Sequence, residues 1–124
     1  MMVDLRALIS VVDDDVSVRE SLSGLLGSLG FDVETFSSAN DFLRSPRIAE
    51  VECIVLDVAM PVMSGPELFQ SMISSGRDIP IVFITGVEDE ILRDRLISMG
   101  AIDCLYKPLC VDELRKAVAS ALHR

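Results

Sequence analysis

The sequence has no tryptophan, one tyrosine and one histidine, and its basic residues are few. Eleven Lys and Arg against 20 Asp and Glu give a formal net charge of −9. Such a domain is not expected to grip nucleic acid or an anionic membrane, since both need a basic face. A serine or cysteine catalytic triad is not expected either, because the only histidine, His123, stands next to the C-terminus.

Long apolar runs are missing as well. The longest fall far short of the roughly 20 residues that a membrane-spanning helix needs. Arg6 precedes a short apolar stretch that runs straight into Asp13, and no small-residue cleavage site follows, which disfavours a signal peptide. The cysteines are odd in number and lack Cys-x-x-Cys spacing, so we expect buried free thiols in a cytoplasmic protein. They are Cys53, Cys104 and Cys110.

The sequence does contain a regular alternation of apolar runs and helical patterns over 124 residues. This length suits one core, and no repeat or linker divides it, so we expect a single domain over residues 1–124. Three runs are rich in β-branched residues and apolar on both faces, as buried strands are, whereas a fourth is more polar and suits a sheet edge. The predicted strands are 8–12, 32–36 (the edge strand), 53–56, 81–84 and 103–106.

Helical patterns fill the intervals between these strands. The first helix repeats apolar residues on one face and is closed by Gly30, and the third has Pro66 in its first turn. Five strand–helix units predict an α/β fold, namely a flavodoxin-like five-stranded parallel sheet of order 2-1-3-4-5 with five helices on both faces. The predicted helices are 16–29, 38–44, 65–76, 88–99 and 111–122.

In that strand order, ligands bind at the carboxyl ends of the first and third strands. Asp13 and Asp14 follow the first strand, and Asp57 follows the third. Neighbouring parallel strands lie about 4.8 Å apart, so these carboxylates converge and repel one another unless a cation lies among them. Oxygen ligands select a hard ion, usually Mg²⁺ where a phosphate is also bound. Each aspartate alone also suits a turn or a helix N-cap, and Asp15 is expected to cap the first helix.

Two other strand ends carry groups that suit phosphoryl transfer. Thr85 can donate a hydrogen bond to a phosphoryl oxygen, and Lys107 can place a positive charge beside it. Together with a cation, they would stabilise the negative charge of a phosphoryl group moving onto Asp57. Taken singly, Thr85 also suits a turn at a strand end, and Lys107 also suits a solvated charge.

Four motifs together resemble the response-regulator receiver domains of bacterial two-component systems, along essentially the whole chain. They are Val-Val-Asp-Asp-Asp at 11–15, Leu-Asp-Val-Ala-Met-Pro at 56–61 with Gly65, Ile-Thr-Gly at 84–86 and Tyr-Lys-Pro at 106–108. A narrower similarity to regulators of nitrogen-fixation genes rests on Ile-Thr-Gly and the second acid run. The resemblance implies a phosphoprotein of phosphorelay signal transduction rather than a turnover enzyme.

The resemblance also implies roles for the acidic residues. Asp57 would accept a phosphoryl group from a sensor histidine kinase or a phosphotransfer protein. Asp14 would bind Mg²⁺ directly and Asp13 largely through water. Asp57 itself and the backbone carbonyl of Ala59 would be further ligands of the metal ion.

The remaining roles implied by the resemblance concern the switch. Lys107 would pair with the phosphoryl group, and the Lys107–Pro108 bond would be cis. Thr85 would move toward the phosphoryl group, and Tyr106 would then turn inward behind it. These movements would alter the surface formed by the last two helices and the last strand, which could also serve for a homodimer.

Three positions depart from the pattern of the family. Ala59 and Val87 stand two residues after Asp57 and Thr85, where many relatives carry longer or polar side chains. We therefore expect them to affect how long a phosphoryl group persists on the protein. Cys110 stands where a better helix N-cap, such as serine, is common, so the last helix is expected to fray at its start.

Three other functions suit parts of the same pattern. A phosphatase with an aspartate nucleophile usually needs a second acid two residues on, where this chain has Ala59. A nucleotide-binding module would need a Gly-x-Gly-x-x-Gly or Walker loop, which the sequence lacks. A non-phosphorylated pseudo-receiver, acting as a protein-binding module, stays open as an alternative, although the acid pair, the acceptor and the lysine are all present.

Overall fold

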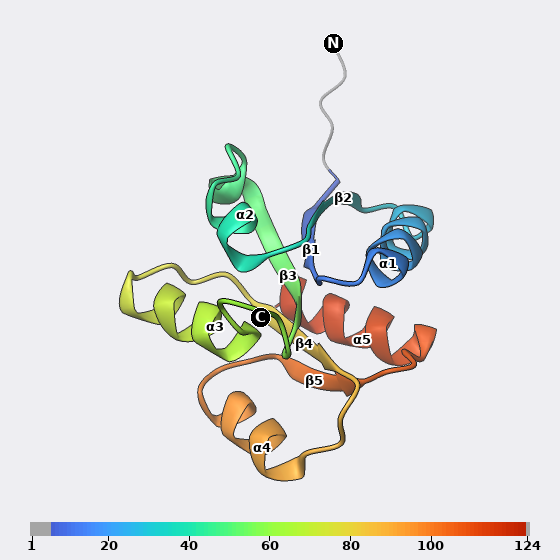
Figure 1. The fold of residues 1–124 in the computed structure, drawn as a ribbon. Coiled ribbons are helices and arrows are strands. Elements are labelled where there is room, and N and C mark those ends of the chain that lie inside the picture. The colour runs from blue at the N-terminus through green and yellow to red at the C-terminus, as the bar shows by residue number, and fades with distance from the viewer. Residues whose placement is uncertain (1–5, 124) are drawn as a thin grey trace.

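The computed structural model describes residues 6–123, in which β-strands and α-helices alternate along the chain (Figure 1). The ends of the expected domain, residues 1–5 and 124, lie outside the described residues. The strands are β1 (Leu8–Val12), β2 (Asp32–Phe36), β3 (Val51–Asp57), β4 (Ile81–Thr85) and β5 (Asp103–Tyr106). The α-helices are α1 (Val16–Ser28), α2 (Ala39–Leu43), α3 (Gly65–Ser74), α4 (Glu90–Ser98) and α5 (Val111–Leu122), and a 3₁₀ turn, η1 (Ile48–Glu50), precedes β3.

The five strands form one parallel sheet in the order β2-β1-β3-β4-β5, which confirms the predicted fold and places the polar strand β2 at an edge. Strand β3 is longer than predicted at both ends, because Val51 pairs with Leu8 of β1 and Asp57 still pairs with Ile84 of β4. Helix α4 begins two residues later than predicted, because the side chain of Asp89 accepts a hydrogen bond from the amide of Leu92 and so caps the helix.

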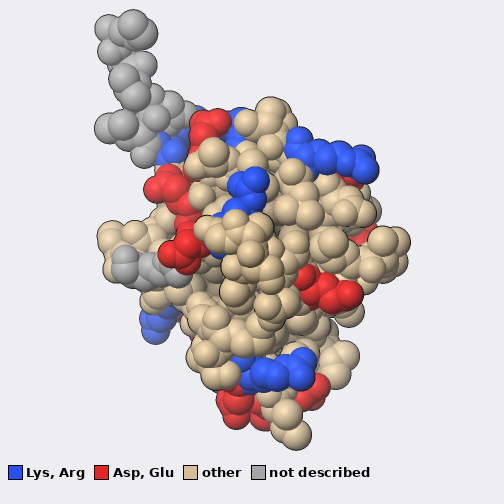
Figure 2. Space-filling model, turned by 90° about the vertical axis from the view of Figure 1, so that its left-hand side faces the viewer, with Lys and Arg blue, Asp and Glu red and all other residues tan. Residues whose placement is uncertain are grey.

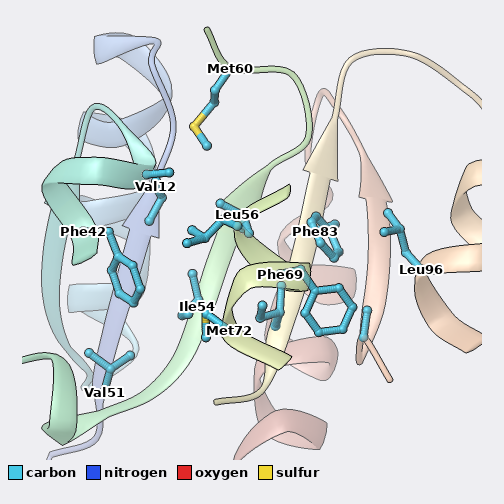
Figure 3. Packing of buried hydrophobic residues seen from close by; sticks show 14 of the residues in the cluster. Val12, Phe42, Val51, Ile54, Leu56, Met60, Phe69, Met72, Phe83 and Leu96 are labelled. Atoms are coloured by element: carbon cyan, nitrogen blue, oxygen red, sulfur yellow. The ribbon is translucent and has the colours of Figure 1, made fainter. Parts of the chain in front are cut away.

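The sheet separates two apolar cores, as Figure 1 shows by the placing of α1 and α5 on one face and α2, α3 and α4 on the other. Alternate residues of each buried strand enter opposite cores, because successive side chains of a strand point to opposite faces. Figure 3 shows the core on the α2 and α3 side, where Phe69 and Phe83 meet edge-to-face with ring centroids 5.6 Å apart. Labelled there are Val12, Phe42, Val51, Ile54, Leu56, Met60, Phe69, Met72, Phe83 and Leu96.

Local capping explains where the helices next to the strand ends begin. The side chain of Asp15 accepts a hydrogen bond from the amide of Ser17, which confirms its predicted role as the cap of α1. Ser64 and Glu67 form a reciprocal capping box at the start of α3. Cys110 occupies the N-cap position of α5 and makes no side-chain capping bond there.

The expectation that all three cysteines are buried is wrong for one of them. Cys53 and Cys104 are buried and free, whereas Cys110 is free and exposed. Burial raises the pKa of the Cys53 thiol to about 12 and also raises that of Cys104. Cys110 escapes burial because it precedes the apolar stripe of α5, whose first buried residue is Leu114.

No α-helix among residues 6–123 is long and apolar enough to cross a bilayer. Figure 2 shows the face on the α2 and α3 side, where acidic and basic side chains are interspersed among uncharged ones. The expectation that the domain binds neither nucleic acid nor membrane stays a prediction.

Candidate functional site

Three carboxylates meet at the carboxyl ends of β1 and β3. Asp13 and Asp14 follow β1, Asp57 is the last residue of β3, and one oxygen of each lies within 4.8 Å of the others. The side chain of Asp13 is fully buried and that of Asp57 is 7% exposed, whereas Asp14 is exposed. The sheet therefore brings together the three acids that the sequence analysis singled out, with two of them largely withdrawn from water.

Lys107 reaches into this acidic cluster from the end of β5. Its Nζ donates hydrogen bonds to Oδ2 of Asp13 at 2.9 Å and to Oδ1 of Asp57 at 3.3 Å. The backbone amide of Lys107 donates to the carbonyl of Thr85 at 2.8 Å, and the Lys107–Pro108 peptide bond is cis. Desolvation lowers the pKa of Lys107, but the hydrogen bond to Asp13 and the charge of Asp57 outweigh it and raise that pKa overall. The ammonium group is therefore held in its charged form.

Asp57 is the most perturbed acid of the site. Burial, assisted by the negative charge of Asp13, raises the pKa of Asp57 to about 6, although Lys107 acts in the opposite direction. A buried carboxylate with a raised pKa at the end of a strand is typical of a functional position. A further cation among these oxygens would favour the ionised form that a nucleophile needs.

The loop between β3 and α3 is held close to Asp57 by backbone contacts. The amide of Gly65 donates to the carbonyl of Val58 at 2.9 Å, and the amide of Val58 donates to the carbonyl of Ile84 at 3.0 Å. A side chain at Gly65 would collide with the carbonyl oxygen of Asp57, so the chain needs glycine here. Ala59 is exposed in this loop, and the predicted role of its carbonyl as a metal ligand stays a prediction.

Thr85 and Tyr106 lie on neighbouring strands, and their hydroxyls contact Val87 and Glu90 rather than the three aspartates. The hydroxyl oxygen of Thr85 accepts from the amide of Val87 at 3.2 Å, so the side chain stabilises the turn that follows β4. The hydroxyl of Tyr106 donates to a carboxylate oxygen of Glu90 at 2.9 Å. Desolvation and this contact with Glu90 raise the pKa of Tyr106 to about 12. The proposed movements of both residues stay predictions.

Two polar partners of the site were missed at the level of sequence. Glu90 holds the tyrosine hydroxyl, and Arg19 of α1 donates to the backbone carbonyl of Asp13 at 2.7 Å. Glu90 stands in an acidic run, which by its sequence predicts the solvent-exposed first turn of a helix. Arg19 stands in the first turn of the helix that follows Asp13, and that position does not show which atom its side chain contacts.

The donor set suits a hard divalent cation. Three carboxylates offer oxygen atoms close enough together to share one ion, and burial, followed by the charge of Asp13, raises the pKa of Asp57 even with Lys107 beside it. Oxygen ligands of this kind, with one ligand exposed to solvent, fit Mg²⁺, which keeps several of its waters when it binds to protein. Because Asp14 is exposed, water can reach this side of the cluster.

Comparisons with known proteins agree with this geometry. The response regulator receiver domain family model matches residues 9–119. The response regulator protein TodT of Pseudomonas putida is 40% identical over 121 residues, which cover 98% of this chain and 53% of TodT. The transcriptional regulatory protein FixJ of Bradyrhizobium diazoefficiens is 38% identical over 116 residues, covering 94% of this chain and 57% of FixJ. The chain thus spans about half the length of these curated relatives.

Solved structures give the same result. The response regulator StyR superposes with a TM-score of 0.88 at 44% identity, over 95% of this chain and 60% of StyR. FixJ-N superposes with a TM-score of 0.84 at 31% identity, over all of this chain and 97% of FixJ-N. The matches to FixJ are consistent with the narrower similarity that the motifs indicated. By its motifs, its strand order and these matches, the chain belongs to the response regulator receiver domain family.

Proposed function

We propose that this receiver domain is a phosphorylatable switch, with Asp57 as the residue that accepts the phosphoryl group. The observation that carries the proposal is the position of Asp57, a largely buried carboxylate that is hydrogen-bonded by Lys107 and flanked by Asp13 and Asp14. The donor is a sensor histidine kinase or a phosphotransfer protein. We propose that residues 1–124 act as one such domain, in the cytoplasm.

The proposed chemistry is transfer from a phosphohistidine of the partner. A carboxylate oxygen of Asp57 attacks phosphorus in line, a P–O bond forms, and the P–N bond breaks with its electron pair returning to the imidazole. Lys107 is already within hydrogen-bond reach of Asp57, so its ammonium group can pair with a phosphoryl oxygen with little movement. Thr85 would donate its hydroxyl to another oxygen after leaving the turn that it now stabilises.

Asp13, Asp14 and Asp57, with the backbone carbonyl of Ala59, would hold the Mg²⁺ ion. When bound, the ion offsets the negative charge that spreads over the phosphoryl oxygens. The two buried acids fix one side of this site, and the exposed Asp14 leaves the other side open to the incoming phosphate. Lys107 and the carboxylates thereby act as a pre-formed electrostatic site rather than as groups that transfer protons.

The output of the switch is proposed to be the surface formed by α4, β5 and α5. Tyr106 lies on this surface and would leave Glu90 when it turns toward Thr85. Arg93 stabilises the surface as it stands, donating to Oδ1 of Asp103 at 2.8 Å and to the carbonyl of Cys104 at 3.2 Å. Phosphorylation can shift this surface only by as much as the phosphoryl group favours one arrangement over the other. A homodimer through the surface is one arrangement that such a shift could control.

The partner kinase is proposed to dock beside α1. A groove between α1 and the segment after β5 is lined mainly by apolar side chains, among them Val18, Leu22 and Leu109, and Lys107 also lines it. This location would bring a phosphohistidine to the rim of the acidic site. The alternative function is that of a pseudo-receiver, a binding module that is never phosphorylated. The same surfaces would serve it, and the chemistry at Asp57 distinguishes the two.

The test is the intact mass of the protein after incubation with acetyl phosphate, with and without Mg²⁺. We expect one phosphoryl adduct that requires Mg²⁺ and is absent from Asp57→Asn. Asp41→Asn, which changes an exposed acid of α2, is the matched control and should still be phosphorylated. A folded wild-type protein that gains no adduct from any donor would favour the pseudo-receiver. Steady release of phosphate from simple phosphate esters would instead indicate a phosphatase.

A further inference from the structure

The backbone of Asp13 is fixed from α1 by a residue that the proposed chemistry does not use. Arg19 is partly buried, and its Nη1 donates to the carbonyl oxygen of Asp13 at 2.7 Å. This is the shortest polar contact described around the site, and it joins a charged donor to a neutral acceptor. It needs an explanation, because an arginine beside an acidic cluster would more simply pair with a carboxylate.

Every other polar group of Asp13 also has a partner. Its amide donates to the carbonyl of Phe36 at 3.1 Å, its Oδ1 accepts from the amide of Asp15 at 2.9 Å, and its Oδ2 accepts from Lys107 at 2.9 Å. The carbonyl that Arg19 holds belongs to the peptide unit between Asp13 and Asp14. Because a peptide unit is planar, holding its oxygen also fixes the direction in which the chain enters Asp14.

We propose that Arg19 is a positioning residue for the metal site, which aims the carboxylate of Asp14 at the cation through the Asp13–Asp14 peptide unit. This inference rests on the proposed function, since it assumes that the three acids hold Mg²⁺. Asp14 is the exposed member of the cluster, and its side chain accepts no hydrogen bond from residues 6–123, so its backbone is what orients it. Groups that orient metal ligands typically contribute 10–100-fold to affinity.

Two roles of Arg19 predict changes of opposite sign. If the guanidinium acted only as a nearby positive charge, it would repel a divalent cation, and its removal would tighten Mg²⁺ binding. If it positions Asp14, its removal would weaken Mg²⁺ binding even though the local negative charge increases. The sign of the change therefore separates the two roles without any phosphorylation assay.

The experiment is a Mg²⁺ titration of the protein alone, followed by amide chemical shifts, for wild type, Arg19→Met, Arg19→Lys and Arg77→Met. Methionine keeps much of the apolar stem of arginine, so the packing of α1 is preserved. Arg77→Met removes the same charge just after the C-terminal end of α3, at the opposite end of that helix from Asp57, and controls for the change in net charge. The same spectra report whether each variant is folded.

We expect Arg19→Met to weaken Mg²⁺ binding about 10-fold, Arg19→Lys to weaken it less, and Arg77→Met to leave it within error of wild type. Lysine can still donate one hydrogen bond, which is why partial rescue is expected. Unchanged or tighter binding by Arg19→Met would overturn the positioning role and leave the proposed function intact. A wild-type protein that binds no Mg²⁺ would overturn both, so the two failures are distinguishable.

Discussion

Lys107 and Asp57 are 50 residues apart in the sequence and share a hydrogen bond of 3.3 Å at the carboxyl edge of the sheet. The same ammonium group holds Asp13 at 2.9 Å, so one cation serves two carboxylates that are themselves almost fully buried. This compensation is incomplete, because burial and the charge of Asp13 still raise the pKa of Asp57 to about 6. The ionised form of Asp57 is therefore disfavoured in the folded protein, and this effect can be measured as a pH dependence of stability.

The first prediction concerns the effect of the raised pKa of Asp57 on the stability of the fold. The pKa of Asp57 is raised from 3.8 to about 6 in the folded protein, so the stability linked to its proton is fully present below about pH 4 and is lost as the pH rises through about 6. Asp57→Asn should therefore raise the free energy of unfolding at about pH 8, in metal-free buffer, by about 1–3 kcal/mol. This difference in the free energy of unfolding between Asp57→Asn and wild type should become smaller toward about pH 4.

The measurement is urea unfolding of both proteins, followed by circular dichroism, across this pH range in the presence of EDTA. Asp94→Asn removes one negative charge from the exposed side of α4 and serves as the control for net charge. If Asp57→Asn is more stable than wild type by the same amount at every pH, the raised pKa of Asp57 is not the cause. A loss of stability at about pH 8 would show that the ion pair with Lys107 outweighs desolvation.

The second prediction concerns the loop that follows Asp57. Val62 has φ of 69° and is 92% exposed, and the amide of Met63 donates to the carbonyl of Pro61 at 2.8 Å, which defines a γ-turn centred on Val62. A left-handed backbone conformation costs a non-glycine residue about 1–2 kcal/mol. Glycine avoids this cost, but it loses more conformational entropy on folding, which costs about 0.5–1 kcal/mol. Val62→Gly should therefore raise the free energy of unfolding by roughly 0.5–1 kcal/mol.

Val87→Gly is the matched control, because Val87 is also an exposed loop valine but has no positive φ. Val87→Gly should not raise the thermal unfolding temperature and should lower it slightly. Equal behaviour of the two variants would mean that the turn at Val62 is not strained.

The sheet and the acidic cluster were predictable because simple repeating patterns encode them. Strands such as Ile81–Thr85 are buried on both faces and read as short apolar runs, and parallel pairing then places Asp13 and Asp57 at one edge. The position of a residue at a strand end does not show which hydrogen-bond partner its side chain takes. The hydroxyl of Thr85 bonds its own turn and Tyr106 bonds Glu90, and both contacts depend on rotamers that the sequence pattern does not reveal.

The same limit explains the errors at the level of single residues. Cys110 was expected to be buried from the number and spacing of the cysteines alone, which do not show that it precedes the buried stripe of α5. The contact of Arg19 with Asp13 joins a side chain to a backbone carbonyl, and the sequence does not show which carbonyls are free to accept. The strained turn at Val62 was invisible because valine itself favours other backbone conformations.

The third prediction concerns a polar atom inside the sheet. Ser10 of β1 is fully buried, and its hydroxyl has no hydrogen-bond partner among residues 6–123. It pairs in register with Glu34 of β2, whose Oε1 is also buried without a partner. An unsatisfied buried hydroxyl costs roughly 1–3 kcal/mol, so Ser10→Ala should leave the protein as stable as wild type or more stable by about 1 kcal/mol.

Ser64→Ala is the control of opposite sign, since this serine caps α3 and bonds the amide of Glu67 at 3.2 Å. Its loss should cost about 1 kcal/mol. If thermal unfolding shows that Ser10→Ala is destabilised as much as Ser64→Ala, the hydroxyl of Ser10 has a partner, such as a buried water.

The last prediction concerns the lifetime of the phosphoryl group, and it depends on the proposed function. Ala59 and Val87 are both exposed, and they stand two residues after Asp57 and Thr85. Neither side chain can hydrogen-bond a water molecule that approaches phosphorus opposite the Asp57 oxygen. We therefore expect slow hydrolysis in the wild type. Ala59→Asn and Val87→His should each shorten the half-life, because an amide or imidazole can orient that water.

A positioned polar group of this kind contributes up to 10²–10⁴-fold to a rate, so a shortening of about 10-fold is a conservative expectation for each variant. The measurement is the decay of the phosphorylated mass peak after acetyl phosphate is removed, in excess Mg²⁺. Ile73→His is the control, because Ile73 is an exposed apolar residue near the C-terminal end of α3, the end of that helix far from the site. Unchanged half-lives in both variants would mean that these two positions do not govern access of water, and that the lifetime is set by the shell of Lys107, Thr85 and the acids.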